Sequence, residues 1–314
     1  MTSESVGRLN EMKNGYWSSV LNRRVQRRRA LTLSGAGLAS AAFLAACGGG
    51  DSGGGSGDGD SSGMVTKPVD TTKEAKRGGT IKDYIRGEPA TMDPFNPNAA
   101  LNAASRSVHG MLLREKPGHL KIADGTIEGD LAESWEFSPD GMQITMKLRQ
   151  GVKWHNKPPV NARTVDVQDV LFSWTRYEDK APLASILANK KSPDAPVLSM
   201  TAPDARTLVI KLKEPVVYVA NYFGGFGSFT GQVMLDPKET DTTLDIRNDM
   251  VGHGPFQLAA HTPSVGFTLK RNPDYWDKDW ALADQIDLPV VTEPATQLSQ
   301  FKAGNIHYFE GMLA

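Results

Sequence analysis

The stretch Leu148-Arg-Gln-Gly-Val-Lys-Trp-His155, followed by the segment from Asp166 to Arg176, decides how the centre of this chain folds. The first part ends a strand and leads into a polar turn. In the second part apolar residues recur at i, i+3, i+4 and i+7, which places them on one face of a helix. These residues are Val167, Val170, Leu171 and Trp174. Asp166 stands where an N-cap is expected, and Asp169 adds a second carboxylate to the first helical turn.

A β-hairpin is predicted directly before this unit. Trp135 to Phe137 and Met142 to Leu148 alternate apolar and polar residues on either side of Ser138-Pro-Asp-Gly141. Ser, Pro and Gly occupy the positions that suit a type I turn, so the two runs are expected to pair as antiparallel strands.

Four blocks in this region resemble consecutive signatures of one family. They are Leu131-Ala-Glu-Ser-Trp135, Ser138-Pro-Asp-Gly141, Leu148-Arg-Gln-Gly-Val-Lys-Trp-His155 and Gln168-Asp-Val-Leu-Phe-Ser-Trp174. The family is the extracellular solute-binding proteins, family 5, the dipeptide, oligopeptide and nickel-type binding lipoproteins of ABC importers. The resemblance implies a mixed α/β (α+β) fold of the two-lobed, periplasmic-binding-protein type.

Further blocks extend the resemblance from Arg77 to about Gly311. They are Thr207-Leu-Val-Ile-Lys-Leu-Lys-Glu-Pro215, Gly252-His-Gly-Pro-Phe256, Arg271-Asn-Pro-Asp-Tyr-Trp276 and Phe301-Lys-Ala-Gly-Asn-Ile-His307. His253 stands where relatives have Thr, and His307 stands where they have Asp. The resemblance therefore does not decide whether the structural hydrogen bond that the family makes at position 307 is kept here. Because relatives are considerably longer, we expect residues 77–314 to be mainly the first lobe. The second lobe would be missing, and the chain would stop at the first crossing between the lobes.

The N-terminal part is expected to be an export signal. Leu31 to Ala46 is an apolar, charge-free run of sixteen residues behind a cluster of arginines. This run is short for a membrane span and has the layout of a signal peptide. Arg28 and Arg29 resemble a twin-arginine signal, and Leu44-Ala-Ala-Cys47 resembles a lipobox, in which Cys47 would carry lipid. The alternative is a retained membrane anchor with a buried structural cysteine.

Residues 1–46 are therefore assigned as a lipoprotein-type signal peptide and residues 47–76 as the lipidated cysteine with a flexible linker. Gly48 to Gly63 is almost wholly Gly, Ser and Asp, a composition that cannot form a core. A metal site built from Asp51, Asp58, Asp60 and Asp70 is the alternative, but the spacing of a calcium-binding loop is absent. The resemblance implies an extracytoplasmic protein held at a membrane surface by its lipid.

Charge and cysteine content exclude several classes of protein. Residues 1–46 hold seven of the 35 basic and two of the 36 acidic residues, which leaves 28 basic and 34 acidic residues, a charge of −6. A mildly acidic body offers no electrostatic footprint for nucleic acid. With Cys47 as the single cysteine, neither an internal disulfide nor a cysteine-based metal site can form.

Other elements follow from local patterns. We expect strands at Thr80–Ile85, Val197–Met200, Thr207–Leu212, Phe267–Arg271 and Ile286–Val291, a turn at Ala202–Ala205, and helices at Asn102–Leu113 and Pro294–Ala303. Pro294 at the start of the last helix and Gly304 just beyond its end fit the usual asymmetry of helix termini.

The family resemblance implies that four segments line a ligand cleft. They contribute Asn98 and Ala100 from the loop Asn96–Asn102, then Leu183, then Tyr222, Phe223, Phe226 and Phe229, and finally Glu310. Peptide-binding relatives often have an aromatic residue where Leu183 stands. The alternative for the aromatic, glycine-rich segment Asn221–Phe229 is a loop whose rings fill the core.

No catalytic constellation is visible in the sequence, so we expect no enzyme, no metal and no cofactor. The six histidines form no metal-binding motif, and neither a nucleophile elbow nor a phosphate-binding loop is present. The expected function is binding of a peptide or similar small solute by a monomer, and delivery to an ABC permease driven by a cytoplasmic ATPase. The ligand could equally be an opine, a sugar or a nickel chelate. A sensory or chaperone-like receptor and a secreted hydrolase are the alternatives.

Overall fold

The structure is a computed structural model that describes residues 69–95, 102–118, 120, 123–225 and 233–309. Within the chain, Lys67–Ala314 forms one compact unit. The predicted signal segment, with Arg28, Arg29 and Cys47, lies outside the described residues. Among the helices of the described ranges, none combines the length and apolar character needed to cross a membrane.

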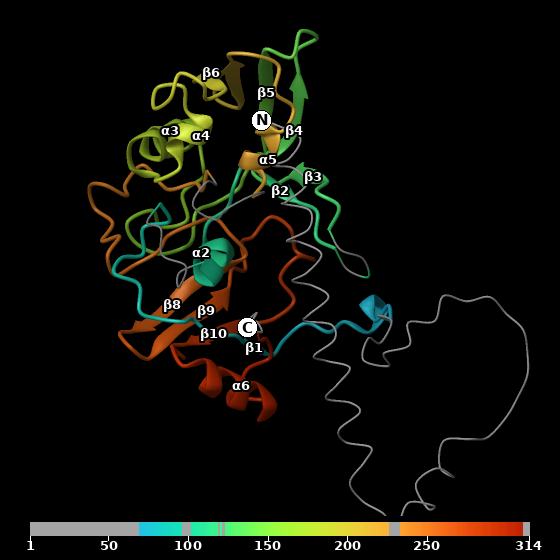
Figure 1. The fold of residues 1–314 in the computed structure, drawn as a ribbon, viewed down its shortest axis with the longest axis vertical. Coiled ribbons are helices and arrows are strands. Elements are labelled where there is room, and N and C mark those ends of the chain that lie inside the picture. Colours follow the sequence, from blue (N-terminus) through green and yellow to red (C-terminus); the bar gives the residue numbers. More distant parts are fainter. Residues whose placement is uncertain (1–68, 96–101, 119, 121–122, 226–232, 310–314) are drawn as a thin grey trace, which may run out of the picture. The chain divides into compact units, whose positions relative to one another are not determined.

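An antiparallel sheet of four strands forms one end of the unit (Figure 1). Its order is β4-β5-β7-β6, with bounds Ala132–Phe137, Gln143–Leu148, Thr207–Leu212 and Val197–Asp204. The predicted hairpin is confirmed, since β4 pairs with β5 and the Gly141 N–H donates to Ser138 O across 2.8 Å. Gly141 has φ +70°, a conformation that glycine adopts without steric cost.

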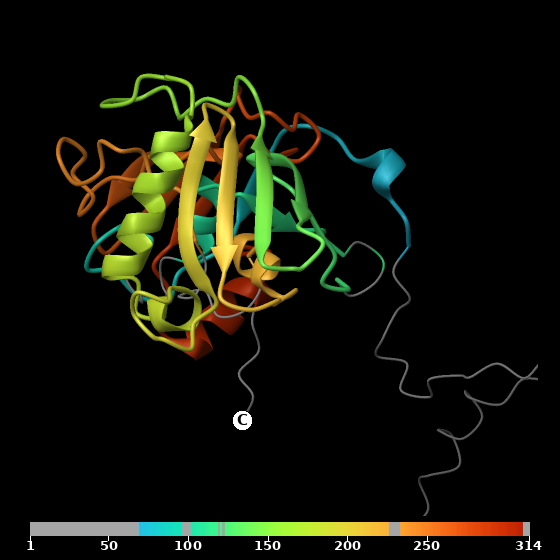
Figure 2. The same ribbon diagram turned by 90° about the horizontal axis from the view of Figure 1, so that it is seen from above.

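The predicted central helix is α3, Val167–Lys180, and it runs alongside the strands of this sheet (Figure 2). The Asp166 side chain accepts the N–H groups of Gln168 and Asp169, and the Asp169 carboxylate accepts the N–H of Asp166, which completes a capping box. The helix ends before Ala181, which precedes Pro182 and is therefore biased toward extended backbone. Its buried stripe packs into the main hydrophobic core.

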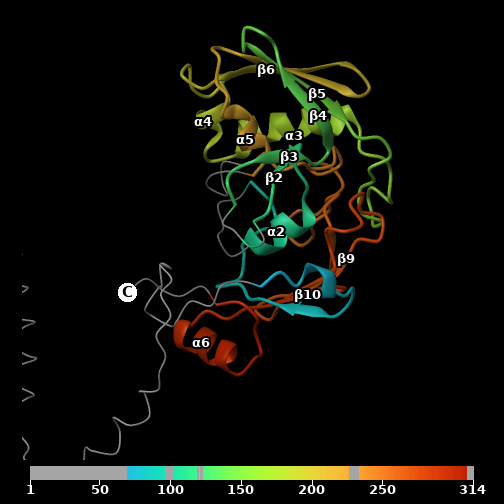
Figure 3. The same cartoon turned by 90° about the vertical axis from the view of Figure 1, so that its right-hand side faces the viewer.

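A second sheet of four strands has the order β1-β10-β9-β8, with bounds Thr80–Lys82, Gln285–Pro289, Gly266–Arg271 and Phe256–Thr262. β1 is parallel to β10, and the other pairs are antiparallel. Helix α2, Asn102–Val108, packs on this sheet over a separate core. Figure 3 shows the two four-stranded sheets at opposite ends of the unit, with α2 between them.

The remaining elements are short. They are the 3-10 helix η1 (Thr72–Glu74), the two-stranded sheet of β2 (Leu113–Glu115) and β3 (Ile127–Gly129), and the helices α4 (Ala184–Leu187), α5 (Val219–Phe223) and α6 (Pro294–Lys302). Helices α4, α5 and α6 lie on the same side of the unit in Figures 2 and 3. The predicted start of α6 at Pro294 is confirmed.

The predicted helix Asn102–Leu113 is too long, because the chain leaves the helix after Val108. Beyond that point the backbone pairs with a segment that is close in space but about 20 positions away in the sequence. The N–H groups of Leu131 and Ala132 donate to the carbonyls of Met111 and Leu112. Backbone pairing between distant segments thus replaces the last helical turn.

The predicted turn at Ala202–Ala205 is also misplaced, because β6 continues to Asp204 and pairs there with Thr207. Asp204 closes the turn by accepting the N–H of Arg206 (2.8 Å) and the hydroxyl of Thr207 (2.6 Å). Pro203 is tolerated inside the strand because β6 is an edge strand with a register shift at this point.

Candidate functional site

Four buried aromatic rings gather beside the C-terminal half of α3. The edge of the Phe95 ring meets Tyr177 at 5.9 Å between centroids, and Trp174 stacks on Tyr177 at 5.5 Å. Phe223 of α5 approaches Trp174 at 6.2 Å. We call Phe95, Trp174, Tyr177 and Phe223 the aromatic cluster; it joins three segments that are far apart in the sequence.

Two predicted cleft residues, Leu183 and Tyr222, meet at this cluster. The Tyr177 hydroxyl donates to the backbone carbonyl of Leu183 across 3.3 Å. Burial raises the pKa of Tyr177, and the neighbouring Tyr222 adds to the rise. The side chains of Leu183 and Tyr222 are half-buried, so each keeps a face toward solvent. Tyr222 also contacts the exposed Tyr218 ring edge-on at 6.2 Å.

Phe223 was predicted to line the ligand cleft, but it lies in the hydrophobic core. Its side chain is fully buried and packs on Trp174 inside the main core. The core-filling alternative therefore describes Phe223, and we assign it no ligand contact. The other predicted contacts lie outside the described residues; they are Asn98, Ala100, Phe226, Phe229 and Glu310.

A buried guanidinium lies beside the aromatic cluster and was not predicted. Arg176 is 3% exposed and donates to Asp93 (2.9 Å), Asp236 and Asp241 (3.1 Å). Burial opposes its charge, but these three carboxylates outweigh burial and raise the pKa of Arg176. His109 approaches the second Asp236 oxygen at 3.4 Å. A sequence signal existed, because a polar face with period i, i+4, i+7 runs along α3 through Asp169, Ser173 and Arg176.

Within the part of the chain that the structure describes, the buried histidines are His109, His155 and His253. Gly252 N–H donates to Nδ1 of His155 (3.2 Å), so Nε2 carries the proton and donates to Gly254 O (3.2 Å). Burial lowers the pKa of His155 to about 3 and that of His253 to about 4, which keeps both rings neutral. His253 stacks on Trp154 at 5.4 Å. Across the described ranges, no cluster of three or more His, Cys, Asp or Glu side chains could hold a metal ion.

His307, for which the resemblance implied an Asp, makes hydrogen bonds to β1. Its backbone N–H donates to the carbonyl of Lys82 across 2.7 Å, and its ring Nδ1 accepts the backbone N–H of Lys82 at 3.3 Å. These two bonds attach this segment to β1, and one of them uses the imidazole.

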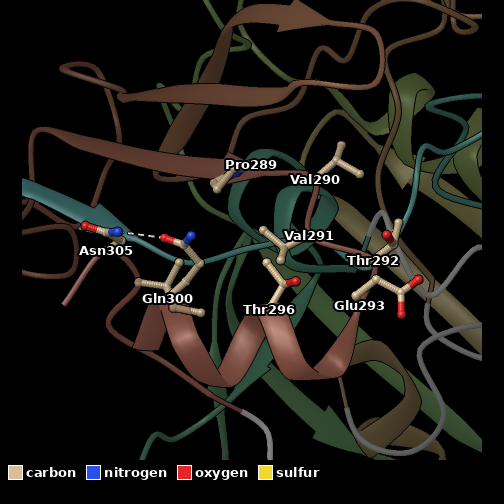
Figure 4. Close-up of a pocket in the computed structure, with 9 residues that line it drawn as sticks. Pro289, Val290, Val291, Thr292, Glu293, Thr296, Gln300 and Asn305 are labelled. Atoms are coloured by element: carbon tan, nitrogen blue, oxygen red, sulfur yellow. Dashed lines mark hydrogen bonds between the residues drawn. The ribbon is translucent and has the colours of Figure 1, made fainter. Parts of the chain in front are cut away.

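A separate hollow of about 490 Å³ lies between α6 and the chain that follows β10 (Figure 4). Its wall mixes apolar and polar groups from Pro289, Val290, Val291, Thr292, Glu293, Thr296, Gln300, Asn305 and Ile306. One edge is fixed, since Asn305 Nδ2 donates to Gln300 Oε1 across 2.7 Å. Helix α6, which lines the hollow, lies on the same side of the unit as α4 and α5 but at the opposite end from α3 and α5, which carry three of the four rings of the aromatic cluster (Figure 3).

Solved structures share this arrangement of sheets and helices. The periplasmic binding protein AgaA of A. tumefaciens R10, in complex with agropinic acid, matches with a TM-score of 0.60 and 26% identity over 73% of this chain and 43% of AgaA. DppA of Helicobacter pylori, in complex with the peptide STSA, has the same fold, with a TM-score of 0.60 and 23% identity over 75% of this chain and 47% of DppA. The predicted mixed α/β fold of the periplasmic-binding-protein type is confirmed.

Sequence comparison points the same way. The oligopeptide-binding protein OppA of Bacillus subtilis is 28% identical over 249 residues, which cover 75% of this chain and 44% of OppA. The chain thus spans less than half the length of that relative. The profile of the bacterial extracellular solute-binding proteins, family 5 (middle part), matches residues 126–314, which include β4, β5 and α3. The chain therefore belongs to the bacterial extracellular solute-binding proteins, family 5.

Proposed function

We propose that this chain is the substrate-binding component of an ABC importer and that it binds peptides or a similar small solute outside the cell membrane. The observation that carries the proposal is the family match over residues 126–314, together with relatives that are named for binding oligopeptides and dipeptides. The ligand would be captured, enclosed and passed to a membrane permease.

The proposed binding surface includes Leu183 and Tyr222, which present half-buried side chains beside the aromatic cluster. Apolar and aromatic walls with a few placed polar groups are typical of small-ligand sites, and backbone pairing suits peptides of varied sequence. Asn98, Ala100, Phe226, Phe229 and Glu310 remain predicted contacts. Ligand enclosure would shift the population of an open and a closed state.

The proposed location is the outer face of the cell membrane or the periplasm, where the protein would be held by lipid on Cys47. The sequence from Arg28 to Cys47 supports export and lipidation, and the Gly/Ser/Asp run behind Cys47 would act as a tether. The protein would act as a monomer that docks on its permease.

Binding without catalysis is the expected chemistry, because the relatives are named as binding proteins. A secreted hydrolase and a solute receptor without transport are the alternatives, and the experiment below tests the proposal against the hydrolase.

Equilibrium dialysis of the full chain against a tryptic casein digest tests the proposal. Mass spectrometry should find intact peptides of two to five residues enriched on the protein side, and the enriched pool should raise Tm as its concentration rises. Agropinic acid serves as a second probe, because AgaA, solved in complex with it, is 26% identical. Cleaved peptides would favour the hydrolase. If the protein enriches neither the peptides nor agropinic acid, that result contradicts ligand binding by this chain.

A further inference from the structure

We infer that Arg176 and Asp93 are positioning residues of the proposed binding surface: their ion pair holds Phe95 against Tyr177 and thereby fixes the wall beside Leu183 and Tyr222. The inference rests on the proposed function. It gives a role in binding to the buried ion cluster of Arg176, Asp93, Asp236 and Asp241.

The first step is that Arg176 is anchored independently of Asp93. Its Nη1 donates to Asp236 and its Nε to Asp241 (3.1 Å), and these two carboxylates are only five positions apart in the sequence. Its side chain is buried, and α3 is fixed at its other end by the capping box. The guanidinium thus has a set position before the third carboxylate is considered.

The second step is that Asp93 uses both oxygens to fix the chain that leads to Phe95. Oδ2 accepts Nη2 of Arg176 at 2.9 Å, and Oδ1 accepts the N–H of Phe95 at 3.0 Å. Asp93 is 83 residues from Arg176 in the sequence. A hydrogen bond to an ionised group is stronger than one between neutral groups, so the backbone at Phe95 is held firmly.

The third step is that two consecutive residues of α3 hold the Phe95 ring. The guanidinium centre of Arg176 lies 5.5 Å from the ring centroid, within the range of cation–π attraction. Tyr177 meets the same ring edge-on, with an angle of 71° between the planes. Phe95 is 4% exposed, so it cannot turn away without opening this packing.

The last step leads from Tyr177 to the surface. Its hydroxyl binds the carbonyl of Leu183, and Tyr222 lies next to it. A shift of Phe95 would release one side of Tyr177 and so disturb the positions of Leu183 and Tyr222. Loss of the ion pair should therefore weaken binding even in a protein that remains folded.

The experiment compares full-length variants by amide hydrogen exchange and by dialysis against the tryptic casein digest. Asp93→Ala and Arg176→Gln remove the ion pair, and Arg176→Lys keeps the charge. Arg163→Lys is the matched control. Arg163 precedes α3 and also pairs with two carboxylates, Asp169 and Glu239, but these lie at the N-terminal end of the helix, away from Phe95.

Asp93→Ala and Arg176→Gln should speed exchange at the Phe95 amide at least about tenfold and weaken peptide retention by a similar factor. Exchange at Ile210, in the central strand β7, should be unchanged. Arg176→Lys should recover much of both effects, and Arg163→Lys should leave the Phe95 amide as it is.

Unchanged exchange at Phe95 in both variants would overturn the inference, and so would an equal loss of retention in Arg163→Lys. If the wild-type chain retains no peptide, the proposed function fails and the binding role of Arg176 fails with it. Wild-type retention combined with an unmoved Phe95 amide would overturn the positioning role alone.

Discussion

The indole N–H of Trp154 donates to Oδ2 of Asp169 across 3.0 Å, and both side chains are fully buried. This hydrogen bond joins the turn after β5 to the first turn of α3, the two halves of the stretch from which the fold was predicted. Asp169 also accepts two hydrogen bonds from Arg163 (2.7 and 2.6 Å) and the backbone N–H of Lys238 at 3.2 Å. One carboxylate thus connects four segments.

Asp169→Ala should therefore lower the free energy of unfolding by about 3 kcal/mol, because it leaves Arg163 with Glu239 as its one carboxylate partner and leaves the indole N–H with no partner. Urea denaturation followed by tryptophan fluorescence measures the change. The control is Asp166→Ala, which removes the N-cap and an exposed ion pair with Lys238 and should cost about 1 kcal/mol. Equal losses in the two variants would contradict a central role for Asp169.

Gly110 is a second site at which a small change should have a large effect. A Cβ at this position would lie 1.8 Å from Cε1 of His253, whereas a Cβ at Gly87 would meet nothing within 4 Å. Gly110→Ala should cost about 3 kcal/mol because the His253 ring must move in a close-packed core. Gly87→Ala should be neutral or slightly stabilising. Thermal unfolding of both variants checks the contrast, and a tolerated Gly110→Ala would contradict the close approach.

Local patterns predicted the parts of the fold that depend on neighbouring residues. The β4–β5 hairpin, the capping box of α3 and the proline start of α6 each follow from residues close in sequence. Helix α2 was predicted too long because its last turn is replaced by pairing with Leu131 and Ala132, which no local pattern reveals. Strand β8 was not predicted; it carries two adjacent alanines, which have weak strand propensity.

In the site, too, some residues were predicted from the sequence, and others are brought together only by long-range contacts. Family resemblance pointed to Leu183 and Tyr222, and both meet at Tyr177. The ion pair of Arg176 with Asp93 joins residues 83 positions apart, and its partner Asp236 is 60 positions away. The polar face of α3 marks Arg176 in the sequence, but only the folded backbone brings its carboxylate partners to it.

Tyr222→Ala should weaken retention of casein peptides by about tenfold or more, because exposed faces of aromatic side chains often dominate small interfaces. Its unfolding free energy should change little compared with Phe223→Ala, which opens a core cavity and should cost about 3–5 kcal/mol. Dialysis and urea denaturation separate the two effects. Val265→Ala, an exposed apolar site in the β8–β9 turn, is the control for binding. Full retention by Tyr222→Ala would remove Tyr222 from the proposed surface.

Cys47→Ser should move the protein from the membrane fraction to the soluble extracytoplasmic fraction, because the lipid would have no attachment point. Fractionation of a bacterial host that expresses the full chain measures this, and Arg28→Lys with Arg29→Lys should instead hold the protein inside the cell. The conservative pair keeps the charge and removes the two arginines of the proposed twin-arginine signal. A Cys47→Ser protein that stays in the membrane fraction would favour the retained-anchor alternative.

Acid should destabilise the folded unit through its buried histidines. The folded pKa values of His155 and His253, about 3 and about 4, lie below the value of 6.5 for an exposed histidine. Unfolded chains therefore bind protons that the folded chain does not. The stability that these neutral rings contribute is complete above pH 6.5 and is lost as the pH falls toward 4 and 3. At pH 5 the loss is about 2 kcal/mol for each ring.

Urea denaturation at pH 7, 6 and 5 measures this loss. The slope of the unfolding free energy against pH gives the number of protons taken up on unfolding. Other groups also titrate in this range, so the comparison with His253→Asn isolates one histidine. That variant should take up about one proton fewer on unfolding at pH 5, and its stability should fall less steeply between pH 6.5 and 5. Both ring nitrogens of His253 are buried without a hydrogen-bond partner, so protonation there has nothing to offset its cost. Equal slopes for the two proteins would mean that His253 gains its proton without unfolding.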